Sequence, residues 1–231
     1  MECKDTCQDG LSDALSDQFY QARREEMSKR VPERRFAHIQ GVADTATELA
    51  RIYDVDPRKA RLAGILHDWD KPYDDDGIRA RAAQVGLEVD PLVLEYMPQT
   101  LHGLTAALWL GKEFPQIPRD VLQAVFRHTT CAVDMTDLDM IIYIADCLEP
   151  GRRFGRVDEY RELVGKVCLE ELFFQVHGYW ISLILEKGRT MHPGTIDVWN
   201  HYAIRHRERK EAQRIAAGLG PTVIDPNAVA G

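Results

Sequence analysis

The sequence has no long uninterrupted run of apolar residues. Its most apolar stretch, residues 172–185, is broken by Gln175 and His177, whereas a helix that spans a membrane needs roughly 18–20 consecutive apolar residues. Residues 1–10 are polar and acidic, without the basic flank and apolar segment of a secretory signal peptide. We therefore expect a cytoplasmic protein with no membrane partner.

Cysteine is scarce, and positive charge is outnumbered. The 5 cysteines among 231 residues are an odd number in a chain too long to need disulfides for a stable core. Cys3 and Cys7 have a spacing that suits a metal or a disulfide, but no second pair accompanies them, so two ordinary thiols are favoured. The 29 Lys and Arg against 37 Asp and Glu give a formal net charge of −8. A long nucleic acid needs a broad basic surface, and we exclude it as a partner.

Strand patterns are also missing, because no segment alternates apolar and polar residues between turn dipeptides. Apolar residues recur instead at three- and four-residue steps, as they do from Phe36 to Tyr53, which is typical of helices with one buried face. Start signals such as Asp56-Pro57 precede several of these segments. The sequence predicts an all-α fold, with helices over residues 32–53, 56–66, 78–85, 100–114, 118–127, 138–148, 157–164, 169–187 and 194–217.

The chain is predicted to contain one main domain with an appendage at each end. Residues 1–31 would form an N-terminal helical extension and residues 32–204 the main domain. Residues 205–214 are charged on every face, which favours a solvated helix extension over a phosphate or partner contact. Residues 218–231 are rich in glycine, proline and small side chains, which favours a loose tail.

Histidine and aspartate carry the chemical signal. His67 and Asp68 are adjacent at the end of an apolar run, and neighbours in sequence can face a common centre only where a helix ends or is distorted. His38, His102, His128 and Asp146 follow the same pattern of lying near predicted helix ends. Each alone has an ordinary interpretation, such as a hydrogen-bonded interior histidine or an exposed carboxylate. Together, imidazoles and carboxylates are the ligands of first-row divalent ions.

The motifs around these residues resemble the HD-domain metal-dependent phosphohydrolases, and in particular the YqeK family of symmetrical diadenosine tetraphosphate hydrolases. The resemblance covers residues 32–200. The matching stretches are Arg35-Phe36-Ala37-His38, Leu66-His67-Asp68-Trp69-Asp70-Lys71, Leu101-His102-Gly103, His128-Thr129-Thr130, Ile144-Ala145-Asp146-Cys147-Leu148-Glu149-Pro150-Gly151-Arg152 and His192-Pro193-Gly194-Thr195.

The resemblance implies an HD-domain helical bundle with a metal centre where helix ends converge. His38, His67, Asp68 and Asp146 would hold one ion, and Asp68, His102 and His128 a second, so that Asp68 bridges the two and an ion-bound hydroxide attacks phosphorus. The ions are commonly iron in this family, although the ligand set also accepts manganese, nickel, cobalt or zinc. The reaction would split the central phosphoanhydride of diadenosine tetraphosphate into two ADP.

Basic and hydroxyl side chains near the motifs are candidates for the phosphates. Asp68 and Lys71 are the expected catalytic residues, and the expected substrate-binding residues are Arg35, Lys71, Arg127, Thr129, Thr130 and Arg152. Asp70 either supports a ligand imidazole or faces solvent. The family often has a proline after the His-Gly pair and a Gly-Arg pair after His-Thr-Thr, where this chain has Leu104-Thr105 and Cys131-Ala132.

Two other functions and one structural question stay open at this point. The chain could be an HD-type nucleotidase or phosphodiesterase for another nucleotide, or a non-catalytic module whose metal shapes a binding surface. Residues 169–185 favour core packing or a subunit contact over a nucleobase site. A two-fold homodimer is the usual expectation for an oligomer.

Overall fold

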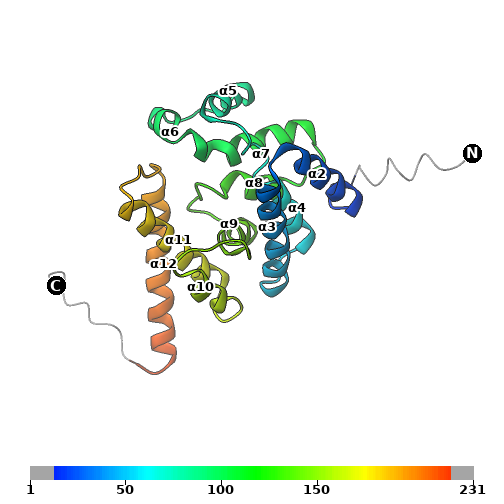
Figure 1. Ribbon diagram of the computed structural model, residues 1–231. Helices are drawn as coiled ribbons and strands as arrows, with labels where there is room; N and C mark the ends of the chain where they lie inside the picture. The colour runs from blue at the N-terminus through cyan, green and yellow to red at the C-terminus, as the bar shows by residue number, and fades with distance from the viewer. Residues whose placement is uncertain (1–12, 220–231) are drawn as a thin grey trace, which may run out of the picture.

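The computed structural model describes residues 13–219, and this part of the chain is helical without a β-strand (Figure 1). The predicted all-α fold is therefore confirmed. Cys3 and Cys7, and most of the predicted loose tail, lie outside the described residues. No helix in the described part is long and apolar enough to cross a membrane.

The helices begin and end close to the predicted positions. They are α2 Asp17–Arg30, α3 Glu33–Ile52, α4 Pro57–Leu66, α5 Asp75–Val85, α6 Pro91–Tyr96, the 3₁₀ helix η1 Pro98–Leu101, α7 His102–Glu113, α8 Arg119–Arg127, α9 Asp137–Leu148, α10 Val157–Leu163, α11 Leu169–Glu186 and α12 Thr195–Ala216. Helix α6 was not predicted. Helix α5 starts three residues before the predicted position, because Asp74 caps it by accepting from the Gly77 N–H at 2.8 Å.

Helix α9 lies at the centre of the molecule, with α3, α4, α8 and α11 packed around it (Figure 1). A capping box between Thr136 and Asp139 fixes its start. All its residues except Asp137 and Asp146 are buried. A helix that is apolar on all sides belongs in the core. Asp146 is therefore a carboxylate in the last turn of an otherwise buried helix.

The predicted appendages are partly joined to this core. Helix α2 packs on α4 and α3, and its Phe19 and Met27 are buried in the main hydrophobic cluster. In α12, Arg205 and Arg209 pair with Glu170 of α11, so the start of the charged segment is docked rather than fully solvated as expected. Residues 212–219 are exposed. The division at residues 31 and 204 stays a prediction.

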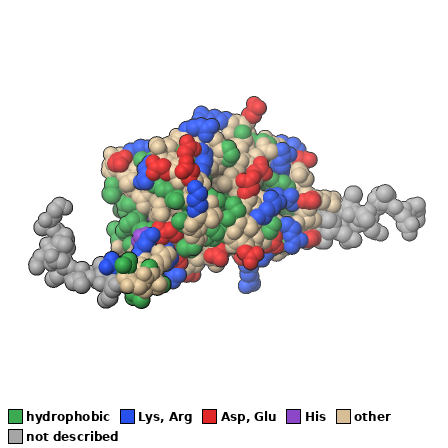
Figure 2. Space-filling view, turned by 90° about the horizontal axis from the view of Figure 1, so that it is seen from below, with side chains coloured by type: hydrophobic (Ala, Val, Ile, Leu, Met, Phe, Trp, Pro, Cys, Tyr) green, Lys and Arg blue, Asp and Glu red, His purple; other side chains and the backbone are tan. Residues whose placement is uncertain are grey.

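Charges of both signs cover the surface. On the face shown in Figure 2, Lys and Arg side chains are interspersed with Asp and Glu, and neither sign forms a continuous field. This face therefore offers no broad basic surface of the kind that a long nucleic acid needs.

Asp70 does neither of the two things expected of it. Its side chain is fully buried, and its Oδ2 accepts from Nε of Arg81 at 3.0 Å, while Nη2 of Arg30 lies 3.9 Å from Oδ1. It contacts no ligand imidazole in the described interactions and does not face solvent. Asp70 instead connects the turn after α4 to α5 and α2.

Candidate metal centre

The six predicted ligands come from five helices, and all of them except His38 lie at or just beyond a helix end. His67 directly follows the last residue of α4, His102 is the first residue of α7, and His128 directly follows α8. His38 lies in α3, and Asp146 lies in the last turn of α9. Because α4 ends at Leu66, His67 and its neighbour Asp68 can both face the same centre.

Two glycines allow the helices to approach closely enough to form this centre. A Cβ on Gly64 would lie 2.6 Å from Cα of Ala43, so glycine lets α4 pack directly against α3. A Cβ on Gly103 would lie 2.6 Å from Cε1 of His128. The glycine of the His102-Gly103 motif therefore leaves the space that the imidazole of His128 occupies.

Three histidines are held in the same way, each by a backbone carbonyl three residues earlier. Nδ1 of His67 lies 2.7 Å from the Gly64 carbonyl oxygen, Nδ1 of His102 lies 2.7 Å from that of Gln99, and Nδ1 of His128 lies 2.7 Å from that of Val125. A carbonyl only accepts, so Nδ1 carries the proton. The Nε2 atoms are left as acceptors that can bind a metal.

The free Nε2 atoms and the carboxylates meet at short distances. Nε2 of His38 lies 3.1 Å from Oδ1 of Asp146, and Nε2 of His102 lies 3.1 Å from Oδ1 of Asp68. Nε2 of His102 and Nε2 of His128 are 3.0 Å apart. Two ligands at right angles on one ion, each about 2.1 Å from it, lie about 3.0 Å from each other. The spacing therefore fits shared coordination.

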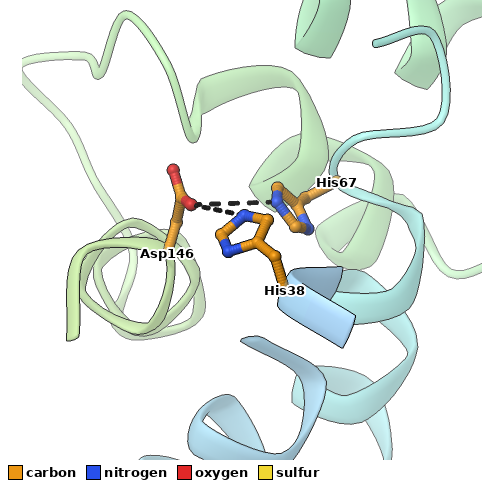
Figure 3. Close-up of side chains that lie close together, drawn as sticks. All are labelled: His38, His67 and Asp146. Atoms are coloured by element: carbon orange, nitrogen blue, oxygen red, sulfur yellow. Dashed lines mark ion pairs between the residues drawn. The ribbon is translucent and has the colours of Figure 1, made fainter. Parts of the chain in front are cut away.

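Two of these acceptors are buried without a hydrogen bond. Nε2 of His38 and Nε2 of His67 have no hydrogen-bond partner, although both point towards Asp146 (Figure 3). Among the described residues, His38, His67 and Asp146 form one group with metal-ligand spacing, and His67, Asp68 and His128 form another. A buried polar atom without a partner is costly, and a divalent ion would satisfy both.

The charge states also suit a metal. Burial lowers the pKa of His67 and lowers that of His128 to about 3, so both imidazoles are neutral at neutral pH, as ligands must be. Burial opposes ionisation of Asp68, but the charged and hydrogen-bonding groups around it, Lys71 among them, outweigh it and hold the pKa of this carboxyl well below its usual range. Burial also acts to lower the pKa of His38, but its hydrogen bonds to the carboxylates of Asp146 and Glu149 outweigh this and raise the pKa, so a metal ion would have to displace a proton there. The neutral imidazoles of His67 and His128 and the ionised carboxylate of Asp68 fit a divalent ion.

Glu149 supports this set, and the sequence did not reveal its role. Its buried Oε1 lies 3.1 Å from Nδ1 of His38, and its Oε2 accepts from the Gly151 N–H at 2.5 Å. It therefore orients His38 as the carbonyls orient the other histidines. The Glu149-Pro150-Gly151 motif was the available signal, but only the fold brings residue 149 to residue 38.

A cavity of about 330 Å³, here called the Trp180 cavity, opens beside the ligands. Arg35, Lys71, Thr129, Thr130 and Arg152 all line it, together with Asp68, His102, His128 and Asp146. Trp180, Ile181 and Ile184 of α11 form an apolar wall. Part of the segment expected to pack in the core or at a subunit contact therefore borders the cavity.

The cations at the cavity lie against the ligands. Nη1 of Arg35 donates to Oδ2 of Asp68 at 3.0 Å, and Arg152 donates to Oδ1 of Asp146 at 2.5 Å. Nζ of Lys71 lies 3.5 Å from Nδ1 of His102. Lys71 is held by a turn after α4, with its N–H bonded to the Asp68 carbonyl, rather than by a continuation of the helix.

Arg127 is not brought to the cavity. Its guanidinium donates to both carboxylate oxygens of Asp134 and to Oδ2 of the buried Asp139, at 3.0–3.1 Å. It does not line the Trp180 cavity. The expectation that it binds phosphate is therefore not carried further, and its contacts connect α8 to the capping box of α9.

Comparisons with known proteins agree with this site. Residues 35–151 match the model of the HD domain, the class of helical protein that carries such a histidine and aspartate centre. The symmetrical bis(5'-nucleosyl)-tetraphosphatase of Staphylococcus aureus is 35% identical over 75% of this chain and 89% of its own length. The protein of the same name from Halalkalibacterium halodurans is 32% identical over 76% of this chain and 92% of its own length.

A solved structure is similar over a larger part of the chain. It is an HD superfamily hydrolase of Clostridium acetobutylicum whose title places it in NAD metabolism, with 34% identity and a TM-score of 0.76 over 80% of this chain and 97% of that one. The chain belongs to the HD-domain family and, within it, to the family of the symmetrical bis(5'-nucleosyl)-tetraphosphatases.

Proposed function

We propose that this protein is a symmetrical bis(5'-nucleosyl)-tetraphosphatase that hydrolyses diadenosine tetraphosphate to two ADP with two divalent metal ions. The observation that carries the proposal is the convergence of four oriented imidazoles and two carboxylates beside a cavity lined with cations. The relatives that carry this printed name support the choice of substrate.

The proposed ligands divide into two overlapping sets. His38, His67, Asp68 and Asp146 hold one ion, and Asp68, His102 and His128 hold the other. Asp68 suits the bridging position because its Oδ1 lies 3.1 Å from Nε2 of His102, while its Oδ2 lies 3.6 Å from Nε2 of His67 and 3.9 Å from that of His38. We propose iron as the metal.

The ions, when bound, would supply a nucleophile from water at neutral pH and would neutralise phosphoryl charge. The protein's own cations complete the binding of a tetraphosphate. Arg35 and Arg152 donate N–H groups to phosphoryl oxygens, and each has donors beyond those used on Asp68 and Asp146. Lys71 stabilises charge that develops on the leaving phosphate, and Thr129 and Thr130 contribute hydroxyls at the cavity wall.

The proposal also covers the setting of the reaction. The substrate is a short dinucleoside polyphosphate or related nucleotide and not a long nucleic acid, the protein works in the cytoplasm, and it forms a homodimer. Sedimentation of the purified protein tests the last point. A monomer at all concentrations used would contradict it.

Anaerobic purification, metal quantification and product analysis test the function together. We expect about two ions per chain, mostly iron, and ADP as the sole nucleotide product from diadenosine tetraphosphate. Formation of AMP and ATP would contradict the symmetrical mechanism. Activity on other nucleotides alone would support a different HD-type nucleotidase, and bound metal without any hydrolysis would indicate a non-catalytic module.

A further inference from the structure

A second hollow lies beside the Trp180 cavity and shares two lining residues with it. It has a volume of about 770 Å³ and is formed by the first half of α3 and the turn after α9. We call it the α3 groove. Of the six proposed ligands only His38 borders it, whereas Arg35 and Arg152 line both hollows. These two arginines therefore stand at the boundary between the cavity and the groove.

One face of α3 forms the floor of the groove. Arg34, Ala37, His38 and Gly41 line it, at the spacing that places residues on one side of a helix. Ala37 and Gly41 have almost no side chain, and a Cβ on Gly41 would already lie 2.8 Å from Oε2 of Glu149. The small residues keep the groove open beside the proposed metal centre.

Arg34 is the free cation of the groove. Its side chain is exposed, and it has no hydrogen bond or ion pair among residues 13–219. A guanidinium plane can stack on a nucleobase and attract phosphate oxygens. The opposite side of the groove carries Pro150 and Gly151, so it has apolar surface but no aromatic ring.

The proposed reaction needs two binding sites for nucleoside diphosphates. Cleavage at the central anhydride leaves one ADP on each side of the scissile bond. Pockets for drug-sized molecules usually measure ~300–1,000 Å³, so the Trp180 cavity of about 330 Å³ has room for about one half of the substrate. The other half must lie elsewhere, and it must remain connected to the metal centre.

We propose that the α3 groove binds the second nucleoside diphosphate half of the substrate, with the tetraphosphate passing between Arg35 and Arg152. This inference rests on the proposed function and adds to it the residues that select a dinucleotide over a mononucleotide. The two arginines contact phosphate at the crossing, and Arg34 stacks on the second base. The Trp180 cavity holds the first base against its apolar wall.

A pair of substrates tests the inference. Diadenosine tetraphosphate and adenosine 5'-tetraphosphate carry the same four phosphates but two nucleosides and one, respectively. We expect Arg34→Ala and Ala37→Trp each to lower the ratio of kcat/KM for the first substrate to that for the second by about fivefold or more, the size of a lost stacking contact. Arg51→Ala is the matched control, because Arg51 is an exposed arginine of the same helix that does not line the groove. An unchanged ratio in both groove variants would overturn the inference.

Equilibrium binding of ADP gives an answer that does not depend on turnover. We expect the metal-loaded wild-type protein to bind two ADP per chain, and Ala37→Trp to bind one. If the wild type does not split diadenosine tetraphosphate, the proposed function fails. The number of ADP molecules bound per chain still shows whether the α3 groove binds a nucleotide. A single ADP per wild-type chain would contradict the groove as a nucleotide site, and Arg34→Ala, an exposed substitution, provides a second variant if Ala37→Trp does not fold.

Discussion

In the proposed metal centre, Asp68 is the residue shared by both ligand sets. It is 3% exposed and its two oxygens face different histidines. We expect Asp68→Ala to lose both ions and all measurable hydrolysis together, because no other carboxylate among the described residues lies between the two sets. Metal content by mass spectrometry and ADP release check this. The exposed Asp44 of α3 provides a control, Asp44→Ala, that should keep both, and full activity in Asp68→Ala would refute the ligand assignment.

Lys71 should behave differently, since it lines the cavity without being a proposed ligand. We expect Lys71→Ala to keep its metals and to lose about 100-fold in kcat, the loss seen when one preorganised donor to a transition state is removed. Steady-state kinetics and metal analysis on the same sample separate the two effects. Equal loss of metal and turnover would mean that the role of Lys71 is misassigned and that it supports the metal centre itself.

Glu149 tests whether orientation of a ligand matters here. Removing a carboxylate that holds a metal-bound histidine typically costs about 10–100-fold in metal affinity, and we expect that range for Glu149→Ala. Glu149→Gln keeps an oxygen acceptor for Nδ1 of His38 and should lose much less. Competition with a chelator measures both affinities. If the two variants lost metal equally, the charge of Glu149 rather than its hydrogen bond would be responsible.

The ends of the predicted helices lie within two residues of the observed ends, except at the start of α5. Asp56 and Pro57 start α4 as expected, because the Asp56 side chain accepts from the Arg58 N–H, and Gly86 ends α5 in the left-handed conformation that glycine favours. The predicted helix of residues 78–85 left out the acidic residues before it, although Asp74 caps a helix that Asp75 begins. Acidic residues favour both a turn and a first helical turn, so the sequence left this choice open.

The partners of charged residues were not predictable in the same way. The sequence indicated His38, His67, His102, His128, Asp68 and Asp146 as an ordered set of motifs, although each residue alone has an ordinary interpretation. Arg127 stood equally close to a motif, but it turns to Asp134 and Asp139. Glu149 contacts His38, which is distant in the sequence, and Asp70 pairs with Arg81, which belongs to none of the motifs. Only the packing of helices decides such pairs.

Three elements are connected at Asp70, and the contact should matter for stability. Asp70 is fully buried and Arg81 is 7% exposed. The guanidinium of Arg81 also lies over Trp109, at 4.6 Å, and that of Arg30 lies over Trp69, at 4.7 Å. Removing one partner of a buried ion pair leaves the other charge uncompensated, at a cost of about 3–5 kcal/mol.

We therefore expect Asp70→Ala to lower the melting temperature by about 6–20 °C, from about 2–4 °C for each kcal/mol in a chain of this length. Differential scanning calorimetry measures it. Asp76→Ala removes an exposed ion pair with Arg79 in the same region, and should cost less than about 1 kcal/mol. A similar melting temperature for both variants would mean that Asp70 is not the connection between α2, α5 and the turn after α4.

The net charge of the whole molecule excludes fewer ligands once the candidate site is described. A net charge of −8 is unfavourable for binding a polyphosphate across the surface as a whole. Two of the acidic residues are proposed ligands, and two divalent ions would more than reverse their charge. Arg35, Lys71 and Arg152 line the same cavity, so with the ions bound the site would be locally positive on an acidic protein. The charge argues against an extended polyanion, and leaves a short one acceptable at the metal centre.

The stability of the whole fold against acid should depend in part on His177. This imidazole is buried and stacks on Phe173, and its Nδ1 shares a hydrogen bond of 3.1 Å with the Tyr143 hydroxyl. Burial lowers the pKa of His177 from 6.5 to about 4. Between these values the unfolded chain binds the proton and the folded protein does not, so stability is fully present above pH about 6.5 and is lost as the pH falls towards about 4.

From pH 7 to pH 5 this single group should cost about 2 kcal/mol of the free energy of unfolding. We expect His177→Gln to lack that part of the loss, because glutamine does not titrate. Urea unfolding of metal-free wild type and variant at both pH values measures the difference, and any constant destabilisation by the substitution cancels in it. An equal loss of unfolding free energy in the two proteins would mean that His177 takes up its proton in the folded state as readily as in the unfolded chain. Water would then reach the imidazole despite its burial.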